Sequence, residues 1–175
     1  MVHDAQALWR AKDALAYTDT LYNLARHLTG DDADAEDLVQ ETFTRALVAR
    51  DSFHGGNLKA WLFRILRNVF IDQYRRRRNN PVDSVESELG AIGTPALDEL
   101  EAGQVRGLVR GDIEAALLAL PAAARQIILL DLEGLSEVEV ADVLDCAVGT
   151  VKSRLARARA ALRRRLADYA REGSP

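Results

Sequence analysis

The feature that most constrains the fold of this chain is a segment of broken composition near its middle. Residues 79–111 interleave two prolines and five glycines with acidic side chains. Such a segment has little to bury and many helix breakers. On either side of it Gly and Pro are sparse, Ala and Leu are abundant, and no sustained alternation of β-branched residues marks a strand. The sequence therefore predicts an all-α protein of two small helical domains joined by a flexible linker.

The domain boundaries follow from the same segment. We expect a first domain over residues 1–78, an acidic linker over 79–111 with a short helix near residues 95–105, and a second domain over 112–175. The chain has 175 residues, of which 48% are hydrophobic, so it can bury one moderate core or two small ones. The separated blocks of charge favour two small cores.

Positive charge is concentrated in two stretches of a chain whose net charge is -4. Residues 57–78 carry seven Lys or Arg and a single acidic residue, Asp72. Residues 146–175 carry eight Lys or Arg against Asp168 and Glu172. Cationic surfaces of this kind displace counterions from a phosphate backbone. The distribution of charge therefore indicates two separate contacts with one nucleic acid.

Three helices are expected in the first domain. The first covers about residues 14–28, and the second begins in the acidic cluster at residues 31–34, whose carboxylates oppose the positive end of a helix dipole. The outward side of the second helix is expected to carry Asp37, Gln40, Glu41, Thr44 and Val48. A loop over residues 51–56 ends in two glycines that can adopt positive φ, and it leads into a third helix over residues 57–78.

The third helix has one apolar and one basic side. Its apolar side carries Leu58, Leu62, Ile65, Leu66 and Val69, and its opposite side carries Arg64, Arg67, Asn68, Ile71, Arg75 and Arg78. We expect the apolar side to build a core and the basic side to meet an anionic partner. The alternative is a solvated charged face. Solvated helices usually mix charges of both signs, whereas this one has almost no acidic partners at i,i+4 spacing.

The second domain is expected to contain three short helices before a longer one. Helices are predicted over residues 112–120 and 121–134, the second opened by a proline whose missing N–H costs nothing in the first turn. Ser136 can cap the next helix, with Glu139 completing a capping box, and this helix should end near Leu144.

The last helix follows a tight turn at residues 146–147. Its inward side carries Val148, Val151, Leu155, Ala158, Leu162 and Leu166, and its outward side carries Lys152, Ser153, Ala156, Arg157, Ala160 and Arg164. Small outward residues allow close approach to DNA, and Lys or Arg can reach phosphates or guanine. Two helices joined by such a turn form the helix-turn-helix that places a recognition helix in the major groove. The alternative is a plain helical hairpin, which does not require so basic an outer face.

Several kinds of site are not expected. No run of about 18 uncharged apolar residues occurs, and the first ten residues already carry Asp4 and Arg10 where a signal peptide would be apolar. We therefore expect a cytoplasmic protein. The lone Cys146 cannot form an internal disulfide, and the three histidines lack ligand spacing. No carboxylates cluster with His or Cys to hold a metal or activate water, so we expect no catalytic site, no metal and no cofactor.

Three motifs occur in order along the chain. They are Asp-Ala-Glu-Asp-Leu-Val-Gln-Glu-Thr-Phe over residues 34–43, Lys-Ala-Trp-Leu-Phe-Arg-Ile-Leu-Arg-Asn over residues 59–68, and Val-Gly-Thr-Val-Lys-Ser-Arg-Leu over residues 148–155. Together they resemble bacterial RNA polymerase sigma factors of the extracytoplasmic-function (ECF) group, in the sigma-70 family. The resemblance spans both domains, and it implies a dissociable, non-enzymatic initiation subunit with a region 2-like first domain and a region 4-like second domain.

The resemblance also implies which residues form each interface. The residues implied to bind core polymerase are Asp37, Gln40, Glu41 and Thr44. Those implied to recognise the -10 element, by capturing a flipped base, are Phe53, His54, Gly55, Gly56, Asn57, Lys59, Trp61, Arg64, Arg67, Asn68 and Arg75. Those implied to read the -35 element are Thr150, Lys152, Ser153, Ala156, Arg157, Arg159 and Arg163.

The implied partners are core RNA polymerase, through its β′ clamp helices and β flap, promoter DNA, and an anti-sigma factor that covers the same surfaces. The acidic linker is expected to avoid DNA and to follow a basic channel of the polymerase. Two positions depart from the family pattern. Some members carry an aromatic residue where this chain has Ala156, and Ala147 replaces a proline common before Val-Gly-Thr. Both departures bear on which -35 sequence is read.

Two other functions fit parts of the sequence. A sigma-like decoy would sequester an anti-sigma factor without binding DNA. Such a decoy has no need of a cationic recognition helix, so Arg157, Arg159 and the arginines at 163–165 count against it. An enzyme acting on nucleic acid is the third possibility, and no cluster of catalytic side chains supports it.

Overall fold

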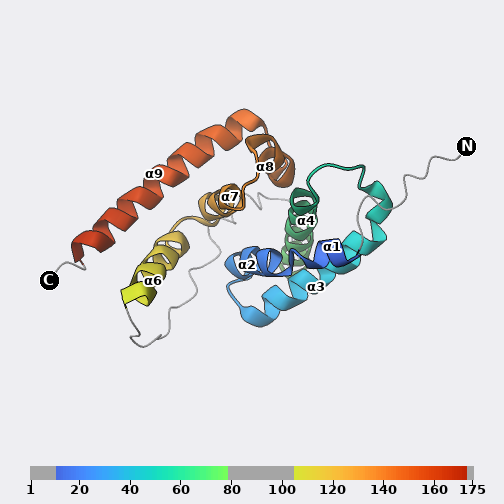
Figure 1. Ribbon diagram of the computed structural model, residues 1–175, viewed down its shortest axis with the longest axis horizontal. Coiled ribbons are helices and arrows are strands. Elements are labelled where there is room, and N and C mark those ends of the chain that lie inside the picture. The colour runs from blue at the N-terminus through green and yellow to red at the C-terminus, as the bar shows by residue number, and fades with distance from the viewer. Residues whose placement is uncertain (1–10, 79–104, 173–175) are drawn as a thin grey trace, which may run out of the picture.

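Helices make up nearly all of the computed structural model, which describes residues 11–78 and 105–172 (Figure 1). Along the chain they are α1 (Ala11–Leu15), α2 (Thr18–Thr29), α3 (Asp32–Val48), a short 3-10 turn (Arg50–Ser52), α4 (Leu58–Arg78), α6 (Val105–Leu118), α7 (Ala122–Leu132), α8 (Glu137–Leu144) and α9 (Val148–Glu172). The predicted all-α fold in two helical halves is confirmed. The path predicted for the acidic linker, and nearly all of its expected helix, lie outside the described residues.

Short-range hydrogen bonds set the helix boundaries in the first half. The Asp31 carboxylate accepts a hydrogen bond from the Asp34 amide at 3.0 Å and so caps α3, as acidic residues do at helix starts. The helix predicted over residues 14–28 is instead two helices, α1 and α2. The chain breaks between them, and the Thr18 hydroxyl donates to the Leu15 carbonyl at 2.7 Å.

The central helix of the molecule is α4. Figure 1 shows it between α2 and α3 on one side and α8 on the other. The predicted core residues Leu62, Leu66 and Val69 are fully buried. Phe63, outside the predicted stripe, is fully buried as well, and Arg67, predicted on the exposed basic side, is only 7% exposed. The expected exposure of Arg67 was therefore wrong, because the second half of the chain packs against that side of α4.

The first helix of the second half begins earlier than predicted. α6 starts at Val105 rather than at residue 112 and continues through Gly107 and Gly111. Each glycine inside a helix costs about 1 kcal/mol relative to alanine, which is why the sequence favoured a break there. Packing of α6 on α7 and α9 offsets that cost. Pro121 is the N-cap of α7 rather than its first helical residue.

The helix-turn-helix element, α8 and α9, matches its predicted local structure. Ser136 Oγ accepts from the Glu139 amide at 3.3 Å, and the Glu139 carboxylate accepts from the Ser136 amide at 2.7 Å. The predicted capping box is confirmed. α8 ends at Leu144, and Asp145 adopts a left-handed conformation with φ of 52°. The chain then turns into α9, whose Val151, Leu155 and Ala158 are buried.

The buried side chains of the two halves form one contiguous cluster rather than two small cores. The expectation of two cores is corrected by the contacts of α4 with α8 and of α2 with α7. Apart from the buried Arg67, the described cations of the two charge blocks are exposed or half-buried on helix faces outside this cluster. The two halves therefore pack against each other through an apolar interface.

No helix within the described residues is both long and apolar enough to cross a membrane.

Candidate functional site

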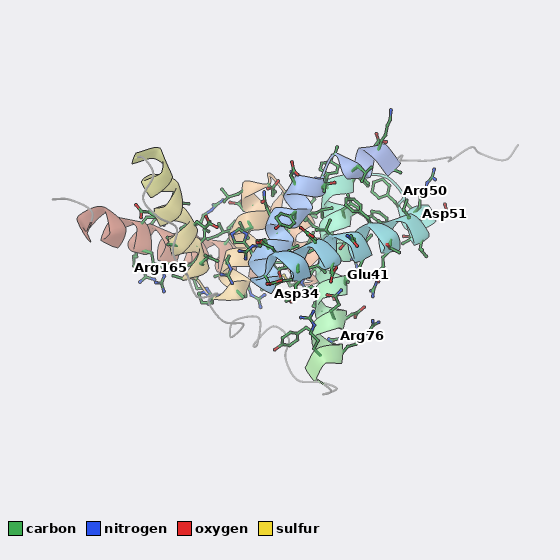
Figure 2. The ribbon with its side chains drawn as sticks, turned by 90° about the horizontal axis from the view of Figure 1, so that it is seen from below. Asp34, Glu41, Arg50, Asp51, Arg76 and Arg165 are labelled. Atoms are coloured by element: carbon green, nitrogen blue, oxygen red, sulfur yellow. The ribbon has the colours of Figure 1, made fainter. Side chains whose placement is uncertain are left out.

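The first candidate surface is the outward side of α3. Asp37, Gln40 and Thr44 are exposed and Glu41 is half-buried, so all four predicted residues share one side of the helix. Figure 2 shows Glu41 on the same side of α3 as Asp34. The Glu41 carboxylate accepts a hydrogen bond from Arg45 Nε at 2.8 Å. This surface therefore presents carboxylate, amide and hydroxyl groups from one side of a single helix.

An ion pair ties the start of α3 to the end of α4. Arg77 Nη2 lies 2.9 Å from Asp34 Oδ1, and Arg77 Nη1 donates to Asp34 Oδ2 at 3.1 Å. The hydrogen bonds from Arg77 hold the pKa of Asp34 below its usual value. Figure 2 shows the last turns of α4, which carry Arg76, projecting beyond this side of α3. The projecting cationic turns and the acidic α3 surface thus lie close together.

The second candidate surface is a cavity of about 390 Å³ around the loop before α4. Gly55 and Gly56 have φ of 99° and 96°, so the chain reverses there in a conformation that residues with a Cβ rarely adopt. The cavity is lined by Ser52, Phe53, His54, Gly55, Gly56, Asn57, Ala60, Trp61, Arg64, Glu139, Asp142 and Val143. Seven of the eleven residues predicted for -10 recognition are among them.

The floor of this cavity includes aromatic side chains. The rings of Phe53 and Trp61 lie 5.2 Å apart at an interplanar angle of 55°, and Phe53 is almost completely buried. The exposed Arg64 lines the same cavity. An aromatic surface beside a cation is the combination that stacks an unpaired base and holds its phosphate.

The other four predicted -10 residues lie elsewhere. Lys59 is not among the residues that line the cavity, and its ammonium group contacts Glu133 of the second half. Arg67 is buried and lines a different cavity. Asn68 and Arg75 are exposed further along α4. The structure therefore gathers the loop with the first turns of α4 but not the whole predicted set.

Sequence reasoning missed three carboxylates beside the loop. Glu139 and Asp142 of α8 line its cavity, and Glu133 contacts Lys59. Each lies more than 70 residues from the loop in sequence, and no local pattern links the two regions. The interface between α4 and α8 brings them together.

The third candidate surface is the outward side of α9. Lys152, Ser153, Ala156, Arg157, Arg159 and Arg163 are exposed, and Thr150 is half-buried. Within this set, Ser153 Oγ donates to the Thr150 carbonyl at 3.1 Å and Arg157 Nε donates to the Ser153 carbonyl at 3.2 Å. The predicted -35 residues therefore form one continuous side of one helix.

Two cations of this surface pair with acidic residues of their own half. Lys152 Nζ lies 3.4 Å from Glu137 Oε2, and Arg159 Nη2 lies 2.6 Å from Asp131 Oδ2. Both pairs are partly exposed, so they exchange readily for contacts with a phosphate. The ion pair holds the guanidinium of Arg159 against Asp131 of α7.

A second cavity, of about 550 Å³, lies between α4, α7 and α9. Its cationic lining consists of Arg67, Arg154, Arg157 and Arg164, and its apolar lining includes Pro121, Leu144 and Ala158. No carboxylate is among its lining residues. Arg157 thus belongs both to the outward side of α9 and to a cavity that faces the first half of the chain. Within residues 11–78 and 105–172, no group of three or more His, Cys, Asp or Glu is placed to hold a metal.

Comparison with known proteins places both halves in described families. The model of Sigma-70 region 2 matches residues 14–80, and that of Sigma-70 region 4 matches residues 110–162. The ECF RNA polymerase sigma factor EcfG of Rhodopseudomonas palustris is 42% identical over 152 residues, which cover 86% of this chain and 81% of that protein. The ECF RNA polymerase sigma factor SigE of Mycolicibacterium smegmatis is 37% identical over 158 residues, covering 89% of this chain and 61% of that longer protein.

A solved structure is similar in fold as well as sequence. The sigma factor RpoE of Bartonella quintana, crystallised in complex with the anti-sigma factor NepR, superposes with a TM-score of 0.64 at 36% sequence identity. The match covers 89% of this chain and 94% of that one. It therefore includes both helical halves.

Proposed function

This chain belongs to the ECF group of the sigma-70 family, as a sigma factor and not an enzyme, and we propose that three of its surfaces divide the work of transcription initiation. Sigma factors bind core RNA polymerase and promoter DNA. In this proposal the first domain, residues 1–78, docks on the polymerase and captures the -10 element. The second domain, residues 112–175, reads the -35 element.

The side of α9 described above carries the proposal. Thr150, Lys152, Ser153, Ala156, Arg157, Arg159 and Arg163 follow one another along a single side of the helix after a short turn. The small side chains of Ser153 and Ala156 leave room for the edges of base pairs. The flanking cations supply phosphate contacts, which fix the register of a helix in the major groove. A decoy that bound only a protein would not need this combination.

The loop cavity supports capture of an unpaired base. Phe53 and Trp61 form an aromatic floor, and Arg64 stands beside it. Stacking on an aromatic ring contributes about 1–3 kcal/mol per base, and the base must leave the duplex to reach such a pocket. The positive φ values of Gly55 and Gly56 shape the rim of this cavity.

The α3 surface supports docking on the β′ clamp helices. Its exposed residues Asp37, Gln40 and Thr44, with the half-buried Glu41, form a polar patch, and the exposed apolar side chains of Leu47 and Val48 follow it at the end of the helix. A patch of this kind pairs with cations and amide donors on a partner helix. We assign the β flap contact to the second domain, and we propose that an anti-sigma factor controls this chain, because the similar sigma factor of Bartonella quintana was solved with one.

Transcription in vitro with purified core polymerase tests this division. Arg157→Ala should lower transcription from a promoter that depends on its -35 element by about tenfold, the cost of one lost base or phosphate contact. It should leave binding to core polymerase unchanged in a pull-down. Arg165→Ala is the matched control, because it removes an exposed arginine of the same helix outside the assigned set.

The double substitution Asp37→Ala and Glu41→Ala should do the reverse, weakening retention on core polymerase while duplex binding by the free chain is unchanged. Glu36→Ala serves as its control, since Glu36 is exposed on α3 outside the assigned set. Equal transcription by Arg157→Ala and Arg165→Ala would show that α9 does not read the promoter. Unchanged retention of the double variant on core polymerase would mean that the polymerase docks on a different surface of the chain.

A further inference from the structure

The cavity between α4, α7 and α9 combines an apolar wall with a row of arginines. Its volume of about 550 Å³ lies within the range of about 300–1,000 Å³ that is typical of small-molecule sites. Its apolar wall consists mainly of small side chains, among them Pro121, Ala123, Ala124, Ala158 and Ala161. The described lining residues include no Asp or Glu. A ligand with an apolar body and negative charge is therefore complementary to this cavity.

Three of the arginines stand on one side of α9. Arg154, Arg157, Ala161 and Arg164 follow one another at spacings of three or four residues, which places them along one stripe of the helix. Arg157 and Arg164 are separated by about 10 Å along the helix axis, and both are exposed. The cavity therefore opens to solvent along this stripe.

The charges of Arg157 and Arg164 are available to a ligand. Among the described residues no carboxylate pairs with either of them, and Arg157 Nε donates to the Ser153 carbonyl at 3.2 Å. A guanidinium group offers parallel N–H donors that match the oxygens of a phosphate. Because the two groups are spaced along the helix, they suit a ligand that carries several phosphates in a row.

One buried amide in the cavity has no hydrogen-bond acceptor. Gln126 of α7 lines the cavity and is 3% exposed, and its side-chain Nε2 has no partner in the described structure. A buried donor without an acceptor costs free energy, which a ligand with an acceptor atom at that place recovers. Ala123 and Ala124 precede Gln126 on the same helix and line the same cavity. A flat apolar ring with a nitrogen acceptor on its edge, as in a purine, satisfies both features.

We propose that this cavity binds a purine nucleoside polyphosphate. The purine lies against the alanines of α7 and accepts a hydrogen bond from Gln126 Nε2, and the phosphates lie along α9 between Arg157 and Arg164. This assignment does not depend on the DNA roles proposed above. Its consequence for DNA does rest on the proposed function: Arg157 is shared with the proposed -35 surface, so the bound nucleotide competes with duplex DNA for that arginine.

Calorimetric titration of the full chain with ATP, GTP and inorganic tripolyphosphate tests the site. The buffer contains no divalent cation, so that the phosphates keep their charge. At least one of the two nucleotides should bind once per chain, and tripolyphosphate, which lacks the purine, should bind about threefold to tenfold more weakly. If neither nucleotide shows saturable binding at millimolar concentration, the proposal is overturned.

Arg164→Gln and Arg165→Gln are a matched pair of variants. Each removes an exposed arginine of α9, but only Arg164 lines the cavity. Arg164→Gln should lower the affinity for the nucleotide and for tripolyphosphate by about tenfold, as expected for one lost charged hydrogen bond. Arg165→Gln should match the parent. Equal losses for the two variants would show that α9 attracts anions without a defined site, and the proposal would fail.

Gln126→Leu tests the purine end of the site. The substitution keeps an apolar side chain of similar size and removes the unpartnered amide, so it should not lower the free energy of unfolding measured in urea. It should reduce nucleotide affinity by about threefold to tenfold and leave tripolyphosphate affinity unchanged. If Gln126→Leu weakens both ligands equally, or if tripolyphosphate binds the parent as tightly as the nucleotide does, the cavity does not recognise a purine.

Duplex binding separates the ligand site from the proposed function. In fluorescence anisotropy with a short random-sequence duplex, saturating nucleotide should weaken DNA binding by the parent chain. Gln126→Leu should require about threefold to tenfold more nucleotide for the same effect. Nucleotide binding that depends on Arg164 and Gln126 but leaves duplex affinity unchanged would support the cavity and contradict the DNA role of Arg157.

Discussion

Helix starts depend on single polar side chains in this protein. Asp31, Asn57 and Ser136 each accept hydrogen bonds from amides of the first turn of their helix, amides that have no partner within the helix itself. Two of these caps border a proposed DNA surface. Asn57 lines the loop cavity, and Ser136 begins the helix that packs on it.

Ser136→Ala should lower the free energy of unfolding by about 1 kcal/mol, because the Glu139 amide loses its acceptor. Urea unfolding followed by circular dichroism measures this change. Ser153→Ala is the control, since Ser153 is exposed within α9 and bonds only a carbonyl of the preceding turn. A loss for Ser136→Ala no larger than that for Ser153→Ala would mean that the capping box does not stabilise α8.

At the scale of elements, α6 and α8 differ in how far local sequence determines them. α8 has a capping box at its start and Asp145 in the left-handed region at its end, and both boundaries were predictable. α6 has no comparable signal at its start and contains Gly107 and Gly111. Its packing on α7 and α9 decides its length.

Alanine substitutions of Gly111 and Gly134 are expected to change the free energy of unfolding in opposite directions. Gly111 lies inside α6 with open space around its missing Cβ, so Gly111→Ala should raise the free energy of unfolding by about 1 kcal/mol. Gly134 also has open space, but its φ is +79°. Gly134→Ala should therefore lower the free energy of unfolding by about 1 kcal/mol. Thermal unfolding of both variants measures these two changes in the free energy of unfolding. Equal changes for the two variants would show that the backbone conformation of the glycine does not determine the direction of the change.

The sequence predicted what depends on neighbours along the chain and missed what depends on the interface between halves. The acidic start of α3, the capping box at Ser136 and the buried side of α9 follow from the local sequence alone. The burial of Arg67 and the pairing of Lys59 with Glu133 do not, because the partners are distant in sequence and approach only when α8 packs on α4. The candidate loop was therefore predictable, whereas the wall that covers it was not.

At the scale of the whole molecule, positive charge is divided between two helices of different halves. α4 carries Arg64 beside the loop cavity, and α9 carries Arg157 on its outward side. In the proposed function α4 contacts unpaired DNA, whereas α9 contacts duplex DNA. The two forms differ in charge spacing, so the two contacts should respond differently to salt.

Salt titrations of DNA binding should separate the two surfaces. Each phosphate contact contributes a slope of about -0.9 in log affinity against log salt for duplex and about -0.7 for single strands. Arg157→Ala should flatten the duplex slope by about one contact and leave the single-strand slope unchanged. Arg64→Ala should do the opposite. Both variants flattening both slopes would contradict the division between α4 and α9.

The hydrogen bond that the Asn57 side chain donates to the Glu139 carboxylate has a kinetic consequence. When the halves part, Asn57 still bonds the amides of Lys59 and Ala60, and Glu139 still bonds the amide of Ser136. Both helix starts therefore stay capped in either arrangement, and neither helix has to unravel for the other to move. We therefore expect separation of the halves to resemble a domain hinge motion, for which microseconds to milliseconds is the typical timescale.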